Sequence, residues 1–300
     1  MSTTQDSVKQ SIEEKEGQAT SSFIKETVSH AKCQPKTLSL FTMENKVVIV
    51  TGGARGLGLT FVRAFLESGC SSMAIIDLRQ SDADESAKEL MKEFGPEDEK
   101  LDVVGYACDV ANESVVQQVM QSIVDRFGRI DTLVTSAGIV ENFPALEYPT
   151  HKIQKLYDIN VHGSFFCARE AARHMIKTGT RGSMVLIASM SANIVNVPQP
   201  QTPYNASKAA VKHMAASLAV EWAQHGIRVN SLSPGYMLTP LTVAVLEKAQ
   251  DMKAKWESLT PAGRMGDPED LKGSVIYLAS DASKFTTGTE LRVDGVSHFS

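Results

Sequence analysis

A strand, a glycine-rich turn and a helix follow one another without a spare residue near position 50. Residues 46–50 read Lys-Val-Val-Ile-Val, a β-branched run that is typical of a strand buried on both faces. Residues 51–58 contain glycines at 52, 53, 56 and 58, and apolar residues from Leu59 to Leu66 then recur at helical spacing. Glycines here allow the backbone to approach a pyrophosphate, which the free N–H groups of a helix N-terminus stabilise. The stretch therefore predicts a nucleotide-binding α/β fold.

Strand and helix patterns alternate along the rest of the chain. Because β-α-β alternation predicts a parallel sheet with helices on both faces, we expect a single doubly wound, Rossmann-like α/β domain with a seven-stranded parallel sheet. No internal repeat or linker divides it, so the domain is expected to span residues 43–300. The further predicted strands are 73–76, 101–107, 130–134, 184–188, 228–232 and 290–295, and the further helices are 82–94, 113–127, 152–177, 203–224 and one long helix starting at 267.

Two segments outside this pattern receive separate predictions. Residues 1–42 are polar, with few large apolar residues, and are expected to form a flexible N-terminal extension. Residues 237–265 are an irregular helical insertion that follows a strand's carboxyl end, where a substrate lid would lie.

Charge and cysteine patterns exclude several classes of protein. The net charge of −5, with no basic run, argues against a nucleic-acid partner, and no stretch approaches the roughly 18 apolar residues of a membrane span. The first 17 residues lack the apolar core of a secretory signal, and they carry four acidic residues, which a mitochondrial presequence avoids. A cytoplasmic protein is therefore expected. The four cysteines, Cys33, Cys70, Cys108 and Cys167, have no metal-ligand spacing, and no metal is predicted.

Tyr204 and Lys208 are candidate reacting groups. They are four residues apart in a predicted helix, so they share one face, and an ammonium beside a phenol favours phenolate. Ser189 follows the predicted strand 184–188, at the edge where ligands bind. Asn160 lies inside a predicted helix, where asparagine is unfavourable, and such a misfit is expected where function overrides local preference. Together these residues suit general acid/base catalysis on an alcohol/ketone couple.

Two acidic residues at strand ends indicate how a dinucleotide would be held. Asp77 lies about twenty residues past the glycines, where a carboxylate accepts hydrogen bonds from both hydroxyls of the adenosine ribose. A carboxylate there disfavours a 2′-phosphate, so we predict NAD, although Arg55 and Arg79 could offset the repulsion and NADP is the alternative. Asp109 could contact an adenine edge.

With these residues in hand, positions 46–297 resemble the short-chain dehydrogenase/reductase family. The signatures are Gly52-x-x-x-Gly56-x-Gly58, Asn160, Ser189, Tyr204-x-x-x-Lys208 and Pro234-Gly235-x-x-x-Thr239. The resemblance implies that Tyr204 is the acid/base, that Lys208 lowers its pKa and holds the nicotinamide ribose, that Ser189 orients the carbonyl and that Asn160 supports a proton relay. The predicted cofactor-binding residues are Gly52, Arg55, Gly56, Leu57, Gly58, Asp77, Asp109, Val110, Ala137, Gly138, Asn160, Tyr204, Lys208, Pro234, Gly235 and Thr239.

Two stretches depart from the family pattern. The family's Asn-Ala-Gly after the fourth strand is Ser136-Ala137-Gly138 here, and its C-terminal Asp-Gly-Gly is Asp294-Gly295-Val296. The first change is expected to loosen cofactor binding and to leave the reacting groups untouched, and the second leaves open what the C-terminus contributes to the subunit contact or the pocket.

The segments 188–191, 194–199 and 204–208 resemble the fungal polyol dehydrogenases and ketose reductases of the mannitol, arabinitol, xylulose and sorbose type. That resemblance implies an NAD(P)-dependent enzyme for a polyol/ketose pair. The family resemblance also implies a homotetramer or homodimer whose subunits contact through helices 152–177 and 203–224. The apolar lid residues Leu238, Leu241 and Val245 leave open a tailoring ketoreductase of secondary metabolism for a less polar ketone. A non-catalytic nucleotide-binding regulator is a remote alternative, against which the intact reacting residues speak.

Overall fold

The structure is a computed structural model that describes residues 36–96, 100–246 and 250–297. The chain divides into two units, residues 1–40 and 41–300. In the first unit, the 3-10 turn η2 (Thr37–Phe41) begins, and the Ser39 hydroxyl donates a hydrogen bond to the Lys36 carbonyl at 2.7 Å. Most of the predicted extension, residues 1–42, lies outside the described residues. The elements that follow all belong to the second unit.

The core of the second unit is one seven-stranded sheet, and every neighbouring pair of strands is parallel. The strand order is β3-β2-β1-β4-β5-β6-β7, so the order reverses between β1 and β4. This confirms the predicted doubly wound sheet and places the ligand crevice outside the carboxyl ends of these strands. The strands are β1 (Val47–Thr51), β2 (Ser72–Asp77), β3 (Asp102–Ala107), β4 (Thr132–Thr135), β5 (Ser183–Ile187), β6 (Arg228–Pro234) and β7 (Glu290–Val293).

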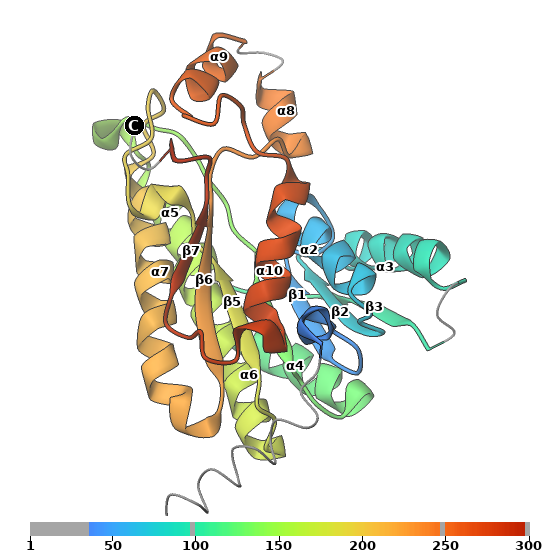
Figure 1. Cartoon of the computed structure of the whole chain (residues 1–300). Helices are drawn as coiled ribbons and strands as arrows, with labels where there is room; N and C mark the ends of the chain where they lie inside the picture. Colours follow the sequence, from blue (N-terminus) through green and yellow to red (C-terminus); the bar gives the residue numbers. More distant parts are fainter. Residues whose placement is uncertain (1–35, 97–99, 247–249, 298–300) are drawn as a thin grey trace, which may run out of the picture. The chain divides into compact units, whose positions relative to one another are not determined.

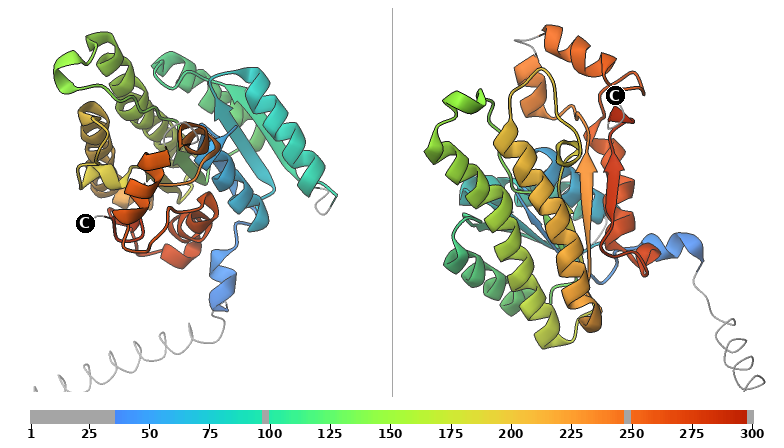
Figure 2. Two further views of the ribbon diagram at one scale, coloured as in Figure 1. Left: turned by 90° about the horizontal axis from the view of Figure 1, so that it is seen from above. Right: turned by 90° about the vertical axis from the view of Figure 1, so that its left-hand side faces the viewer.

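Helices cover both faces of the sheet (Figures 1 and 2). One face carries α2 (Gly56–Glu67), α3 (Gln80–Phe94) and α10 (Lys272–Ala279), and the other carries α4 (Glu113–Phe127), α6 (Ser164–Thr178) and α7 (Thr202–Trp222).

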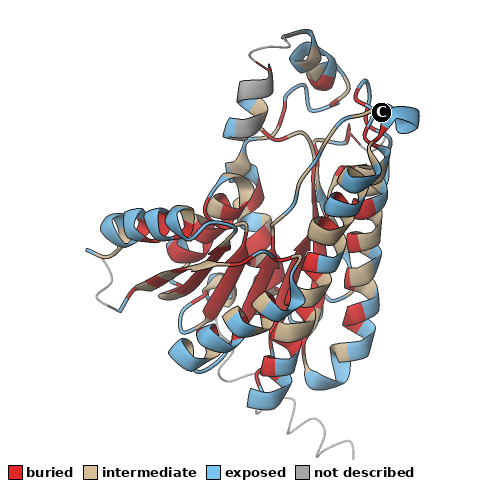
Figure 3. Ribbon diagram, turned by 180° about the vertical axis from the view of Figure 1, so that it is seen from behind, coloured by how far each residue is buried: buried red, intermediate tan, exposed pale blue. Residues whose placement is uncertain are grey.

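Strand β1 shows how the two layers are built. Val48 and Val50 pack with Phe61 and Phe65 of α2, whereas Ile49 belongs to the opposite core. Successive residues of a strand point to opposite faces, so a β-branched run without polar interruption buries both. In Figure 3 the central strands are accordingly buried, the edge strands β3 and β7 are only partly buried, and the outer surfaces of the helices are exposed.

The long helix predicted over residues 152–177 is present with one irregularity. It consists of α5 (Thr150–Tyr157), a π-helical turn η4 (Asp158–Gly163) and α6. The long helix expected from residue 267 is shorter than predicted, because a 3-10 turn η7 (Pro268–Leu271) precedes the eight residues of α10. Residues 237–265 contain α8 (Pro240–Leu246) and α9 (Gln250–Ser258), beyond the carboxyl ends of β6 and β7 (Figure 1).

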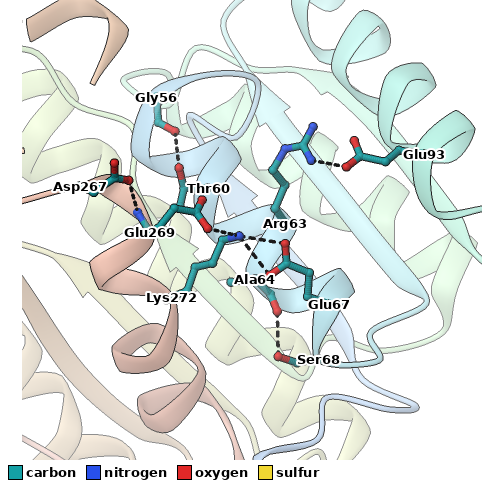
Figure 4. Close-up of polar contacts among 10 residues, drawn as sticks. All are labelled: Gly56, Thr60, Arg63, Ala64, Glu67, Ser68, Glu93, Asp267, Glu269 and Lys272. Carbon is teal, nitrogen blue, oxygen red and sulfur yellow. Dashed lines mark hydrogen bonds and ion pairs between the residues drawn. The ribbon is translucent and has the colours of Figure 1, made fainter. Parts of the chain in front are cut away.

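Ion pairs fasten helix α2 to its neighbours (Figure 4). The Lys272 ammonium contacts Glu67 of α2 at 2.8 Å and Glu269 of η7 at 2.5 Å. Arg63 of α2 pairs with Glu93 of α3 at 2.6 Å. These contacts tie α2, which begins in the glycine turn, to α3 and α10.

We predict that Lys272→Met destabilises the protein modestly. Partial burial lowers the pKa of Lys272, but hydrogen bonds to Glu269 and Glu67 raise it more, so the pKa is above its usual value. The folded state therefore binds this proton more tightly than the unfolded state, and the stabilisation is present at pH 7. Urea unfolding should show a loss of about 0.5–1 kcal/mol in the free energy of unfolding, reduced in 1 M salt. Lys284→Met, which breaks the exposed pair with Asp281, is the control; an equal loss there would contradict the assignment.

Candidate active site

Two glycines of the turn pack so closely against neighbouring backbone that no side chain could fit at their positions. Gly52 has φ +63, and a Cβ atom on it would lie 2.8 Å from the Ala137 Cα, while a Cβ on Gly58 would overlap the Gly52 carbonyl oxygen. The N-cap Arg55 makes no side-chain hydrogen bond to the helix that begins at Gly56. The N-terminal N–H groups of α2 are thus free of a side-chain cap, as a pyrophosphate site requires.

Asp77 lies against this turn. Its Oδ2 accepts a hydrogen bond from the Ala54 N–H at 3.1 Å, and its Oδ1 accepts from the Leu78 N–H at 2.8 Å. The end of β2 and the glycine turn therefore meet, as the spacing predicts. Arg79 is directed to Asp82 at 2.6 Å, and exposed Arg55 lies near the same carboxylate.

The segment after β4 closes the next side of the crevice. The Ala137 N–H donates to the Thr51 hydroxyl at 3.2 Å, which fixes Ser136-Ala137-Gly138 beside the turn. Asp109, at the end of β3, is exposed and accepts from the Ala111 N–H at 3.0 Å, whereas Val110 is buried. Val110 packs on the π-helical turn, because a Cβ on Gly163 would lie 2.7 Å from its Cγ2.

The π-helical turn η4 explains why Asn160 lies inside a helix. Its side chain is 1% exposed; Oδ1 accepts from the Ile139 N–H at 2.8 Å and Nδ2 donates to the Ile139 carbonyl at 3.0 Å. Nδ2 also donates to the Ser207 hydroxyl of α7 at 3.1 Å. π-turns are frequent at functional sites. Here the turn lets one amide join the loop after β4 to the helix that carries Tyr204 and Lys208.

Lys208 is buried beside this amide. Its Nζ donates to the Ile187 carbonyl at the end of β5, at 2.8 Å, and burial lowers its pKa to about 8. A Cβ on Gly138 would lie 3.3 Å from Asn160 Oδ1 and 3.6 Å from Lys208 Nζ. The structure therefore brings the predicted residues Gly138, Asn160 and Lys208 together.

The Tyr204 phenol lies beside the Ser189 side chain. Burial of the phenol raises the pKa of Tyr204, and the Ser189 side chain lowers it by less, so the pKa lies above its usual value. The sequence predicted the opposite direction from the neighbouring ammonium. That prediction is wrong for this structure, because the burial of the phenol outweighs the other contributions, with Nζ of Lys208 5.8 Å from the ring centroid.

Beyond β6, Pro234-Gly235 and Thr239 occupy the remaining edge. Gly235 lies close to β7: its N–H donates to the Val293 carbonyl at 2.9 Å, and a Cβ would lie 2.6 Å from the Asp294 Cα. The Thr239 hydroxyl accepts from the Thr242 N–H at 3.2 Å, at the start of α8. Where the family has its second C-terminal glycine, Val296 adopts φ 72, a conformation that β-branched residues rarely adopt.

The sequence signatures did not reveal a set of polar side chains next to Ser189. Ser191, Asn196, Gln199 and Gln201 are buried and hydrogen-bonded to one another or to Tyr236. The only sequence signal was the density of amide residues between 193 and 205, which by itself indicates nothing about burial.

The described residues contain neither a metal-binding cluster nor a membrane-spanning helix. Among those residues, no group of three or more His, Cys, Asp or Glu side chains could hold a metal ion. No helix there is long and apolar enough to cross a membrane. Cys70, Cys108 and Cys167 are buried free thiols, with pKa values raised by burial, and Cys33 lies outside the described residues.

Known proteins match most of the chain. Residues 52–297 match the family described as enoyl-(acyl carrier protein) reductase. D-arabinitol 2-dehydrogenase [ribulose-forming] of Candida tropicalis is 42% identical over 264 residues, 85% of this chain and 93% of that protein. NADH-dependent L-xylulose reductase of Ambrosiozyma monospora is 40% identical, over 85% of this chain and 96% of that protein. NADP-dependent mannitol dehydrogenase of Hypocrea jecorina is 37% identical, over 87% and 95%.

A solved structure agrees. A short-chain type dehydrogenase/reductase from Mycobacterium marinum has a TM-score of 0.80 and 37% identity, covering 87% of this chain and 98% of its own.

We predict that Lys208→Met stabilises the protein while it abolishes activity. The folded-state pKa of about 8 is below the usual lysine value, so the unfolded chain binds the proton more tightly. Burial of the ammonium thus destabilises the fold below pH 8, and this penalty disappears as pH rises from 8 towards 10.5. At pH 7 the variant should gain about 1–3 kcal/mol in the free energy of unfolding. Denaturant unfolding at pH 7 and pH 9.5 should show this gain shrinking; a loss at pH 7 would contradict it.

Proposed function

The chain belongs to the short-chain dehydrogenase/reductase family, and we propose that it is an NAD(P)-dependent oxidoreductase acting on a polyol/ketose pair. One observation carries the proposal. Tyr204, Ser189 and Lys208 converge at the carboxyl end of β5, next to a glycine turn in which side chains would overlap backbone. A phenol, an alcohol and an ammonium in one place suit proton transfer at a carbonyl oxygen.

The residues present fit a nicotinamide dinucleotide. The turn 52–58 would hold the pyrophosphate, Asp77 the adenosine ribose, and Lys208 the nicotinamide ribose. Gly235 and Thr239 would meet the nicotinamide end, while Asp109 and Val110 would border the adenine. When bound, the cofactor supplies the hydride acceptor or donor.

The chain's own residues would handle the proton. In the structure the Ser189 hydroxyl donates to Ser191 Oγ; with substrate bound, that O–H would turn to the substrate oxygen and orient it, and Tyr204 would give or take the proton at that oxygen. Because the raised pKa keeps Tyr204 protonated at neutral pH, the residue is ready to donate in ketone reduction. Alcohol oxidation needs the phenolate, so that direction is favoured at higher pH. Asn160 holds the loop after β4 in place, and a water-mediated proton relay through it remains part of the proposal.

Two lines of reasoning support a hydroxylated substrate. The similar proteins include an arabinitol dehydrogenase, a xylulose reductase and a mannitol dehydrogenase. In this chain the surroundings of Ser189 are polar, with Ser191 and Asn196 both buried and hydrogen-bonded. The alternative, a less polar ketone, was suggested by the apolar residues Leu238, Leu241 and Val245, and its support is weaker. Leu238 packs in a small cluster with Trp256, and the side chains of Leu241 and Val245 lie outside the described residues.

We propose NAD rather than NADP. Two unit charges 4 Å apart repel by about 4 kcal/mol at an effective dielectric constant near 20, so Asp77 would oppose a 2′-phosphate. Arg79 is already paired with Asp82. Relatives of both kinds exist, one NADH-dependent and one NADP-dependent.

The remaining expectations are also proposals. They are a cytoplasmic location, a catalytic domain over residues 43–300, a substrate lid over 237–265, and a homotetramer or homodimer through α5–α6 and α7. Exposed apolar side chains on two of these helices, Ile176 and Val220, support the subunit contact, because a partner would cover them.

The test of function is a screen of NADH and NADPH oxidation. We expect turnover with ribulose, xylulose, sorbose or fructose, and kcat/KM for bulky aromatic or polyketide ketones at least tenfold lower. Fast turnover confined to the bulky ketones would replace the polyol assignment with the less polar one. Tyr204→Phe is the control: kcat should fall about 10²–10⁴-fold while NADH binding, followed by fluorescence, is retained. A variant with unchanged kcat would indicate that Tyr204 is not the acid/base.

We predict that Asp77→Ser shifts cofactor use towards NADP. The variant removes the carboxylate that would face the 2′-phosphate, but it also removes the acceptor of the Ala54 N–H, so both cofactors lose some affinity. The ratio of kcat/KM for NADPH to that for NADH is therefore the informative quantity, and it should rise at least tenfold. Asp125→Ser on α4 is the control. A wild-type enzyme that already prefers NADPH would overturn the Asp77 argument.

A further inference from the structure

Buried polar side chains of the loop after β5 are hydrogen-bonded to Ser189 and to one another. The amide cluster consists of Ser191, Asn196, Gln199, Gln201 and Tyr236, and the first four are each at most 9% exposed. Burying amides and hydroxyls costs free energy unless they are hydrogen-bonded. A cluster of this size next to a reacting group is therefore a candidate for a second role at the same site.

The cluster is joined to Ser189 by an unbroken chain of hydrogen bonds. The Ser189 hydroxyl donates to Ser191 Oγ at 3.0 Å, and Ser191 Oγ donates to Asn196 Oδ1 at 2.5 Å. Asn196 Nδ2 then donates to the Tyr236 hydroxyl at 3.1 Å. Gln201 fixes Asn196 from the other side, since its Nε2 donates to the same Oδ1 at 2.9 Å.

The direction of these bonds determines what Tyr236 can still do. Trp256 Nε1 can only donate, and it donates to Gln199 Oε1 at 3.1 Å, so Gln199 must turn its Nε2 towards the Tyr236 oxygen, 3.4 Å away. Amide groups of Asn196 and Gln199 thus both donate to this phenol. A phenol oxygen that accepts two hydrogen bonds keeps one donor, its own O–H. Among the described residues, that O–H meets no hydrogen-bond acceptor.

Tyr236 contacts both the loop after Ser189 and helix α9. It follows Pro234-Gly235 at the end of β6, next to β5, with Ile187 and Leu232 in register. Its ring stacks on Trp256 of α9 with centroids 4.4 Å apart and planes 10° apart, while its hydroxyl is held by the loop after Ser189. That loop and α8–α9 lie beyond the same end of the sheet (Figure 1).

We propose that Tyr236 is a specificity-determining residue that donates a hydrogen bond to a substrate hydroxyl near the reacting carbon. This inference rests on the proposed polyol/ketose function and deepens it. A hydroxyl group of a polyol or ketose can accept the hydrogen bond that the Tyr236 O–H offers. A ketone without further hydroxyl groups leaves this O–H unpaired. Unpaired polar groups in a closed site are the usual means by which an enzyme rejects an analogue that lacks a hydroxyl.

Tyr236→Phe tests the proposal, because it keeps the stack on Trp256 and removes only the hydroxyl. We expect kcat/KM for the best ketose to fall about 10- to 100-fold, mainly through KM, while kcat/KM for 2-pentanone changes less than threefold. Tyr277→Phe is the matched control, since Tyr277 on α10 is also partly buried and shares a hydrogen bond with Thr286. If Tyr236 only supported the amide cluster and Ser189, both substrates would lose activity equally, which would overturn the proposal.

Deoxy analogues of the ketose provide a second measurement that does not depend on the variant folding. Wild-type kcat/KM should fall at least tenfold for one monodeoxy ketose, and Tyr236→Phe should cause no further loss with that analogue. Equal wild-type activity on every monodeoxy ketose would overturn the proposal. If the wild-type enzyme reduces ketoses but Tyr236→Phe lowers kcat/KM equally for ketoses and simple ketones, this inference alone is refuted. If the wild-type enzyme is inactive on all ketoses, the proposed function is refuted as well.

Discussion

A parallel sheet must be covered on both faces, and the rest of the molecule follows from this requirement. Because neighbouring strands are parallel, a crossover must carry the chain from the end of one strand back to the start of the next. All strands therefore have their carboxyl ends on the same side of the sheet. The turn after β1, the loop after β4, Ser189 after β5 and Tyr236 after β6 all lie at that end. Residues more than 180 positions apart in the sequence, such as Gly52 and Tyr236, thereby lie at the same end of the sheet.

Burial adjusts the two titrating groups in opposite directions. The pKa of the Tyr204 phenol is raised and that of the Lys208 ammonium is lowered to about 8, and burial is the largest contribution to both. Each group is thus moved towards its neutral form, which costs stability in the case of the lysine. The Ile187 carbonyl offsets part of this cost. A ligand that offers the Lys208 ammonium further hydrogen-bond acceptors would therefore stabilise the buried charge.

The polar surroundings of Ser189 distinguish this site from a general carbonyl pocket. The amide cluster connects Ser189 to Tyr236 and, through Gln199, to Trp256 on α9. The orientation of the Ser189 hydroxyl and the position of α9 are therefore linked by hydrogen bonds. Such a network is costly when it is only partly satisfied, so a change in one amide should affect the whole cluster.

The strands, most helices and the parallel, doubly wound character of the sheet could be predicted from the sequence, because hydrophobic period and glycine placement are local properties of a chain, whereas the strand order came from the structure. The grouping of Asn160, Ser189, Tyr204 and Lys208 was expected from family signatures, and the structure brings these residues together. Sequence could not supply the partners of Asn160, the upward pKa shift of Tyr204 or the left-handed backbone at Val296. Nor did it indicate the amide cluster. These features depend on which distant groups pack together and how much water they exclude, and only the tertiary structure decides that.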